Sequence, residues 1–221
     1  MFGDIKQKKL QEGAYRNMGI VKKILILALV AVISVTVIVF TGYRADSNLR
    51  SEVQVIENEL YKYFGGTDFD GKEISADVFN DATVTMINIW ATDCHPCINE
   101  MPELSELSKE YGDKGLQIIG LCAGSRGVPI YNTDETKRAA LDKEAKAIVK
   151  KDNLEYTMMF PSESFGNKYV KKAATAFPYT VFVDRTGKAI EAKSGAGTKE
   201  DWMKIFDEVL EKAEEGETAC Y

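Results

Sequence analysis

Apolar residues along the chain form either unbroken runs or helical repeats, and the two patterns predict different elements. The runs TVTMINIW at residues 83–90 and LQIIGLC at 116–122 are rich in β-branched residues and have no helical period. Such runs are typical of strands buried on both faces of a sheet. Apolar residues that recur every three or four positions predict helices over 94–111, 135–151 and 198–215.

Shorter segments complete the predicted order of elements. They are a helical spacer at 48–64, a hairpin at 65–75, a loop at 123–134, a short run at 156–160, a helical turn at 164–172 and a hairpin at 177–193. Thr198 is suited to cap the final helix. The order strand–helix–strand–helix followed by hairpin–helix predicts an α/β fold. We expect a mixed central sheet with parallel central strands, antiparallel edge strands and helices on both faces.

One apolar segment does not fit a globular core. Residues 24–40, ILILALVAVISVTVIVF, carry no charge and have no polar face. Extended to residue 43, the segment is long enough to cross a bilayer as a helix. Small residues are not placed to form a signal-peptidase site after the run, so an uncleaved anchor is expected rather than the alternative, a cleaved signal peptide.

Charge is distributed unevenly around this predicted single N-terminal transmembrane helix. Residues 1–23 hold six basic and two acidic residues, a net charge of +4, whereas residues 46–221 hold 21 basic and 32 acidic residues, a net charge of −11. Positive flanks stay in the cytoplasm, so we expect a cytoplasmic segment 1–23, an anchor 24–43 and an exported remainder. The acidic remainder argues against a nucleic-acid partner. The segment 216–221 is an acidic tail.

The candidate chemistry is concentrated in the sequence CHPC. The chain has four cysteines and one histidine, and two of the cysteines, Cys94 and Cys97, enclose His95 and Pro96. Cys94 follows a predicted buried strand and opens a predicted helix, where unpaired backbone N–H groups and the helix dipole stabilise a thiolate. Proline suits the first helical turn. We therefore expect Cys94 to attack a disulfide and the less accessible Cys97 to resolve the mixed disulfide.

Other uses of the cysteine pair fit the sequence less well. A zinc site is disfavoured because there is no second C-x-x-C to complete four ligands, and a purely structural disulfide is a further alternative. Covalent haem attachment requires histidine directly after the second cysteine, where this chain has Ile98. Cysteine- or serine-protease chemistry is excluded, because it requires a histidine distant in sequence. Cys122 is predicted to be an inert core thiol, and Cys220 an exposed one.

Three separated motifs, INIWATDCHPCINEMPEL, GLQIIGL and FPYTVFVDRTGKAI, resemble in order and spacing the TlpA/ResA-like class of membrane-anchored thioredoxin-fold proteins. The resemblance covers residues 66–215, which we expect to form a thioredoxin-like domain behind the juxtamembrane spacer 44–65. It implies the same roles for Cys94 and Cys97. Pro102 corresponds to the proline that bends the active-site helix in these folds.

The resemblance also assigns roles to residues around the dithiol. Asn88 stands where thioredoxin itself keeps a buried aspartate. Glu100 matches a family glutamate near the dithiol and shares a helix face with Cys97, so it is a candidate to exchange a proton with Cys97. The alternative is a solvated surface acid.

A substrate-contacting surface is implied at Trp90, His95, Pro96, Phe177 and Pro178. Phe177-Pro178 corresponds to the cis-proline loop that faces the dithiol, with an ordinary trans-proline as the alternative. This loop would leave backbone groups of Phe177 free to pair with an extended substrate segment.

Three residues depart from the family pattern. Asp93, directly before Cys94, disfavours a thiolate there, whereas protonated His95 favours it. The bulky Phe177 is expected to narrow the substrate groove.

These patterns predict an extracytoplasmic, membrane-tethered thiol–disulfide oxidoreductase that acts as a reductase, without a cofactor or metal. The expected partners are a disulfide-bearing protein substrate and a membrane electron-donor protein. The resemblance implies cytochrome c biogenesis or another envelope thiol pathway. The alternatives are a disulfide-forming oxidase and a non-catalytic metal or haem chaperone that uses the dithiol as ligands.

Overall fold

The computed structural model describes residues 60–218, with side chains as far as residue 215. The predicted segment 1–23, the anchor 24–43, most of the spacer 44–65 and the end of the 216–221 tail lie outside the described residues. The boundaries of these regions stay predictions. In the described part of the chain, no helix is both long and apolar enough to cross a membrane.

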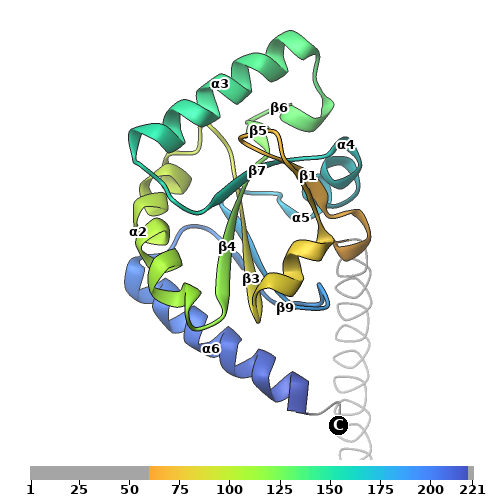
Figure 1. Cartoon of the computed structure of the whole chain (residues 1–221). Coiled ribbons are helices and arrows are strands. Elements are labelled where there is room, and N and C mark those ends of the chain that lie inside the picture. Colours follow the sequence, from red (N-terminus) through yellow and green to blue (C-terminus); the bar gives the residue numbers. More distant parts are fainter. Residues whose placement is uncertain (1–59, 219–221) are drawn as a thin grey trace, which may run out of the picture. The chain divides into compact units, whose positions relative to one another are not determined.

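Two parallel strands form the centre of the sheet, β3 (Val84–Trp90) and β4 (Leu116–Cys122) (Figure 1). All seven residues of β3 are buried. The register pairs Val84 with Leu116 and Trp90 with Cys122, so the two strands end at the same edge. Strands that are apolar on both faces need helices on both sides. The strands predicted at 83–90 and 116–122 are confirmed.

Five further strands extend the sheet on either side of this pair. On one side, β8 (Tyr179–Asp184) is antiparallel to β3, and β9 (Ala189–Ser194) is antiparallel to β8, which confirms the hairpin predicted at 177–193. On the other side, β7 (Thr157–Pro161) is parallel to β4.

The strand β1 (Gly65–Asp68) is antiparallel to β7, and β2 (Glu73–Ser75) closes that edge as the partner of β1. The resulting order is β2-β1-β7-β4-β3-β8-β9. This is the mixed sheet that the sequence predicts, parallel at its centre and antiparallel at its edges.

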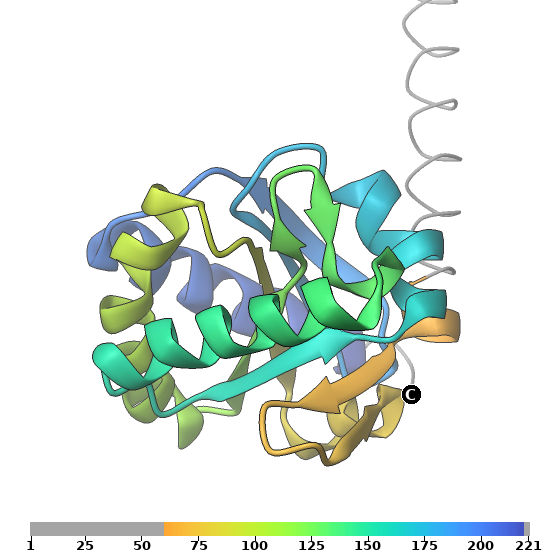
Figure 2. The same cartoon turned by 90° about the horizontal axis from the view of Figure 1, so that it is seen from above.

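Three long helices cover the sheet: α2 (His95–Gly112), α3 (Glu135–Lys151) and α6 (Lys199–Thr218). The helix α2 packs against β4 and α6. Figure 1 shows α3 above the strands and α6 below them, and Figure 2, seen from above, again separates α3 from α6. The predicted start and end of α3 are confirmed. The helix α2 begins one residue later than predicted, because Cys94 caps it, and α6 ends three residues later.

The short elements are η1 (Ala76–Asp81), β5 (Gly124–Ser125), β6 (Val128–Pro129), η2 (Ile130–Asn132), α4 (Glu163–Phe165), η3 (Gly166–Val170) and α5 (Lys171–Ala173). The loop predicted at 123–134 therefore contains short regular elements that the prediction missed. Residues 124–129 form a small antiparallel hairpin, and a 3₁₀ turn follows it. The strands of this hairpin have two residues each, too few to produce a recognisable alternation.

Aromatic side chains fix α6 to the sheet. Phe182 of β8 lies with its ring centroid 6.5 Å from that of Trp202 and 6.0 Å from that of Phe206, both on α6. The ring centroid of Tyr111, near the end of α2, lies 5.1 Å from that of Phe206. Phe182, Trp202 and Phe206 have no exposed surface. The positions of α2 and α6 are therefore determined together, by one shared aromatic core.

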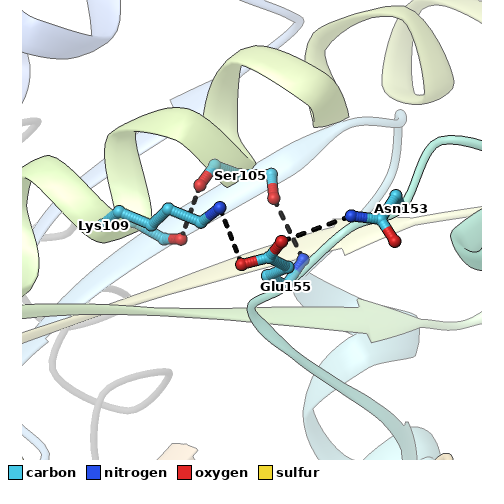
Figure 3. A network of polar contacts seen from close by, with 5 residues as sticks. Ser105, Lys109, Asn153 and Glu155 are labelled. Atoms are coloured by element: carbon cyan, nitrogen blue, oxygen red, sulfur yellow. Dashed lines mark hydrogen bonds and ion pairs between the residues drawn. The ribbon is translucent and has the colours of Figure 1, made fainter.

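A polar network joins α2 to the segment that enters β7 (Figure 3). The backbone N–H of Glu155 donates to Ser105 Oγ at 3.0 Å, and Lys109 Nζ lies 2.7 Å from Glu155 Oε2. Asn153 Nδ2 donates to Glu155 Oε1 at 3.2 Å. The network fixes the backbone directly before Tyr156, which is buried.

Candidate active site

Cys94 and Cys97 form a disulfide at the point where β3 ends and α2 begins. Cys94 is the N-cap of α2, and its Sγ accepts a hydrogen bond from the Cys97 backbone N–H at 3.3 Å. His95 and Pro96 occupy the first helical turn and are exposed. When the pair is reduced, the same N–H group and the helix dipole favour negative charge on Cys94 Sγ.

Neither cysteine has exposed surface in the disulfide form: the exposed fraction is 0% for Cys94 and 0% for Cys97. The exposed fractions therefore do not distinguish the two cysteines in this form, and the greater accessibility of Cys94 stays a prediction for the reduced pair. Thiol–disulfide exchange requires direct contact between sulfur atoms. In this form, side chains and backbone of the surrounding segments cover both sulfur atoms.

The hairpin β5–β6 is one of these surrounding segments. The Thr92 N–H donates to Gly124 O at 2.8 Å, and the Arg126 N–H donates to Asp93 Oδ1 at 3.0 Å. Asp93, one of the residues that depart from the family pattern, thus holds the tip of the β5–β6 hairpin through its carboxylate. Asp93 has a positioning contact that its place in the sequence did not reveal.

The segment before β8 is the site's second neighbour. The Phe177–Pro178 peptide bond is cis, as the resemblance implies, so the trans alternative was wrong. Pro178 is buried, and Phe177 is half-buried against the core. Among residues 60–218, no hydrogen bond involves the backbone of Phe177.

Glu100, three residues after Cys97 on α2, is buried with 3% of its surface exposed, so the alternative of a solvated surface acid was wrong. Its Oε1 accepts from Asn88 Nδ2 at 3.1 Å. Its Oε2 accepts from the Gly197 N–H at 3.0 Å and from Trp202 Nε1 at 3.2 Å. Each donor matters, because a buried group left without its partner costs about 1–3 kcal/mol.

Burial raises the pKa of Glu100 above its ordinary value, and the hydrogen bonds from Gly197, Asn88 and Trp202 and the charge of Lys193 partly oppose that rise. Burial, followed by the nearby Glu100 charge, raises the pKa of the Tyr156 hydroxyl. A carboxylate with a raised pKa is a stronger proton acceptor than an exposed glutamate. Glu100 is therefore chemically competent for the role that the resemblance implies.

Sequence reasoning missed most of the carboxylate's partners. Gly197 and Trp202 lie about a hundred positions after Glu100, and no local pattern links them to it. Asn88 was singled out, but not its contact with Glu100 or its second bond, which Nδ2 donates to Thr180 Oγ1 at 3.1 Å across the β3–β8 pair. Only the order of the strands brings these groups together.

Trp90 is buried in this structure, as are the two cysteines, and its predicted contact with substrate stays a prediction. Its exposed fraction is 0%, and its indole N–H has no hydrogen-bond partner among the described residues. Trp90 is part of the core in this structure, because the last position of a strand covered on both faces is still interior. His95 and Pro96 directly follow Cys94 at the start of α2, and Phe177 comes two residues before Tyr179, which pairs with Ile89 near the end of β3.

Comparison with known proteins agrees with this geometry. The Redoxin family model matches residues 61–210. The chain belongs to the Redoxin family. A thiol-disulfide oxidoreductase ResA from Bacillus thuringiensis is 32% identical over 147 residues, covering 66% of this chain and 72% of that protein. A ResA from Bacillus cereus is 28% identical over 186 residues, covering 84% of this chain and 92% of that protein. This alignment is longer than the part of the chain that the structure describes.

Among solved structures, a thioredoxin-family thiol:disulfide interchange protein from Chlorobium tepidum aligns with a TM-score of 0.53 at 21% identity, covering 66% of this chain and 92% of that chain. At this identity the likeness establishes the fold alone. This Redoxin-family chain is thus a ResA/TlpA-like oxidoreductase with a thioredoxin-like fold and a Cys94–Cys97 pair.

Among the described residues, no group of three or more His, Cys, Asp and Glu side chains is placed to hold a metal ion.

Cys122 is expected to stay unreactive in the folded protein. It is fully buried beside Trp90, and burial raises the pKa of its thiol to about 12. Because only the thiolate alkylates, iodoacetamide at about pH 8 should leave Cys122 unmodified in the oxidised native protein and label it completely in urea. Peptide mass spectrometry reads both samples, and rapid labelling of the native form would contradict the assignment.

Proposed function

We propose that this protein reduces disulfide bonds in partner proteins, with Cys94 as the nucleophile and Cys97 as the resolving thiol. The observation that carries the proposal is the Cys94–Cys97 pair at the N-terminus of α2, with the buried Glu100 carboxylate one turn further along the same helix. These are the three groups that a two-step exchange needs: a stabilised thiolate, a second thiol and a proton acceptor.

The proposed reaction transfers two electrons from the dithiol to the partner. The Cys94 thiolate attacks one sulfur of the partner's disulfide, forms a mixed disulfide and displaces the other sulfur as a thiolate. Glu100 takes the Cys97 proton, and the Cys97 thiolate attacks Cys94 Sγ. This second step forms the Cys94–Cys97 disulfide and releases the partner's remaining thiolate. A membrane electron-donor protein then returns two electrons.

The substrate is proposed to bind as an extended segment beside Phe177. The backbone N–H and C=O of Phe177 have no hydrogen bond among the described residues, so they are available to pair with a substrate's main chain. His95 and Pro96 are exposed on the dithiol side of this segment. Main-chain pairing would bind substrate segments of many different sequences. The half-buried Phe177 ring would limit the size of the segment that fits.

Substituting the two cysteines separately tests these roles. In a Cys220→Ser background, Cys94→Ser should reduce disulfide turnover to the uncatalysed rate, because no nucleophile remains. Cys97→Ser should complete the first attack and accumulate a mixed disulfide, visible on non-reducing gels. Cys122→Ser is the matched control and should keep full turnover. Undiminished turnover in Cys94→Ser would rule out the proposed nucleophile.

The direction of electron flow is proposed to be reductive. Asp93 directly precedes Cys94 and Glu100 lies one turn beyond Cys97, and negative charge near the pair disfavours thiolates. Destabilising the reduced form lowers the reduction potential. Equilibration with dithiothreitol buffers should therefore give a potential near that of thioredoxin, about −270 mV, whereas a value near about −120 mV would make the protein an oxidant.

The catalytic domain is proposed to be tethered outside the cytoplasm by residues 24–43. The uncharged run at 24–40, the basic segment before it and the acidic remainder after it support this arrangement. The full chain should stay in the membrane pellet after an alkaline carbonate wash, and protease added to intact spheroplasts should digest the domain. Release by carbonate, or protection from protease, would refute the proposed location.

A further inference from the structure

The segment between β9 and α6 and the first turn of α6 together supply two of the three hydrogen bonds to the Glu100 carboxylate. Asn88 donates from the sheet, whereas the Gly197 N–H and the Trp202 indole both donate to Oε2 from this segment and the first turns of α6. The two donors are close together: a Cβ atom on Gly197 would lie 3.0 Å from Trp202 Nε1. The conformation of residues 195–197 therefore determines how the carboxylate is held.

Lys193 holds that conformation. Its Nζ donates to Gly195 O at 2.8 Å and to Ala196 O at 2.9 Å, and it lies 5.0 Å from the centroid of a Trp202 ring. Gly195 has a φ of +88°, which suits glycine in the turn, and its N–H donates to Pro178 O at 2.9 Å. The ammonium group thus connects the turn to the indole that contacts Glu100.

We propose that Lys193 is a positioning residue of the active site, which clamps the 195–196 carbonyl groups so that the Gly197 and Trp202 N–H groups stay directed at Glu100. The inference rests on the proposed function, in which Glu100 exchanges a proton with Cys97. Lys193 does not touch the reacting sulfur atoms in this scheme. It acts through the carboxylate, both by holding two of its donors and by placing a positive charge near it.

The positive charge of Lys193 also affects the pKa of Glu100. The Lys193 charge lowers the pKa of Glu100 against the effect of burial, which raises it. Tyr156 is the other described ionisable group that interacts with Glu100. Its hydroxyl stays neutral over the pH range in which Glu100 titrates, because its pKa is raised. Cys97 titrates only when the disulfide is reduced. Removing the Lys193 charge and its hydrogen bonds should therefore raise the Glu100 pKa further.

The test measures the Glu100 pKa directly, in the oxidised full chain in detergent micelles. Carboxyl ¹³C NMR with labelled glutamate follows the titration, and Glu100→Gln identifies the signal. Lys193→Met keeps an aliphatic stem on Trp202 but removes the charge and both hydrogen bonds, and should shift the Glu100 pKa upward by about 1 unit. Lys193→Arg should restore most of the original value.

Lys188→Met is the matched control, because Lys188 is exposed in the turn of the same hairpin and should leave the Glu100 pKa unchanged. If Lys193→Met fails to fold by circular dichroism, Lys193→Gln provides the second variant, which keeps a donor and loses the charge. A Glu100 pKa that is the same in the wild type and in the folded Lys193 variant would overturn the positioning role.

Exchange kinetics separate this inference from the proposed function. If both hold, the acid limb of the pH–rate profile for resolution shifts upward in Lys193→Met by the same amount as the Glu100 pKa. A shifted pKa with an unshifted profile would support Lys193 as the positioning residue and overturn the role of Glu100 in proton exchange. A purely structural role for Lys193 would lower the stability without moving either titration.

Discussion

A carboxyl group buried beside a disulfide is tolerated only when its oxygen atoms are supplied with hydrogen-bond donors. Glu100 obtains these from β3 through Asn88, from the turn before α6 through Gly197 and from α6 itself through Trp202. Desolvating a carboxylate without such partners costs several kcal/mol. The sheet, the active-site helix and the C-terminal helix are therefore tied together at one group. The same burial raises the pKa of Glu100 and suits it to proton exchange.

The position of the cysteine pair depends on the covered centre of the sheet. Because β3 is buried along its whole length, the chain emerges at the carboxyl edge of the sheet only after Trp90 and turns directly into α2. Cys94 lies in that turn as the helix cap, where its sulfur accepts the Cys97 N–H. The β5–β6 hairpin is hydrogen-bonded to Asp93, directly before Cys94, and β8 begins opposite Ile89 near the end of β3. In the oxidised form the enclosure is complete, because neither cysteine has exposed surface.

The elements that the sequence predicts well are the long ones, in which an apolar run or a helical repeat extends over many residues. The strands β3 and β4 and the helices α2, α3 and α6 extend over 7 to 20 residues, and the structure places each close to its predicted bounds. The β5–β6 hairpin has two residues in each strand and was predicted as loop. The resemblance implies a substrate contact for Trp90, and the burial of this residue at the end of β3 could not be inferred from the resemblance.

The sequence by itself determined the chemistry of this protein: a C-x-x-C pair at a strand-to-helix junction, a glutamate one helical turn later and a proline before a late hairpin. These are local relations, set by the spacing of residues along one element, so they can be read without a structure. Only the tertiary structure decided that Glu100 is buried, that Trp202, Gly197 and Lys193 surround it, and that Trp90 is interior. Those contacts join segments about a hundred residues apart, and their partners are chosen by strand order and packing, which leave no local pattern in the chain.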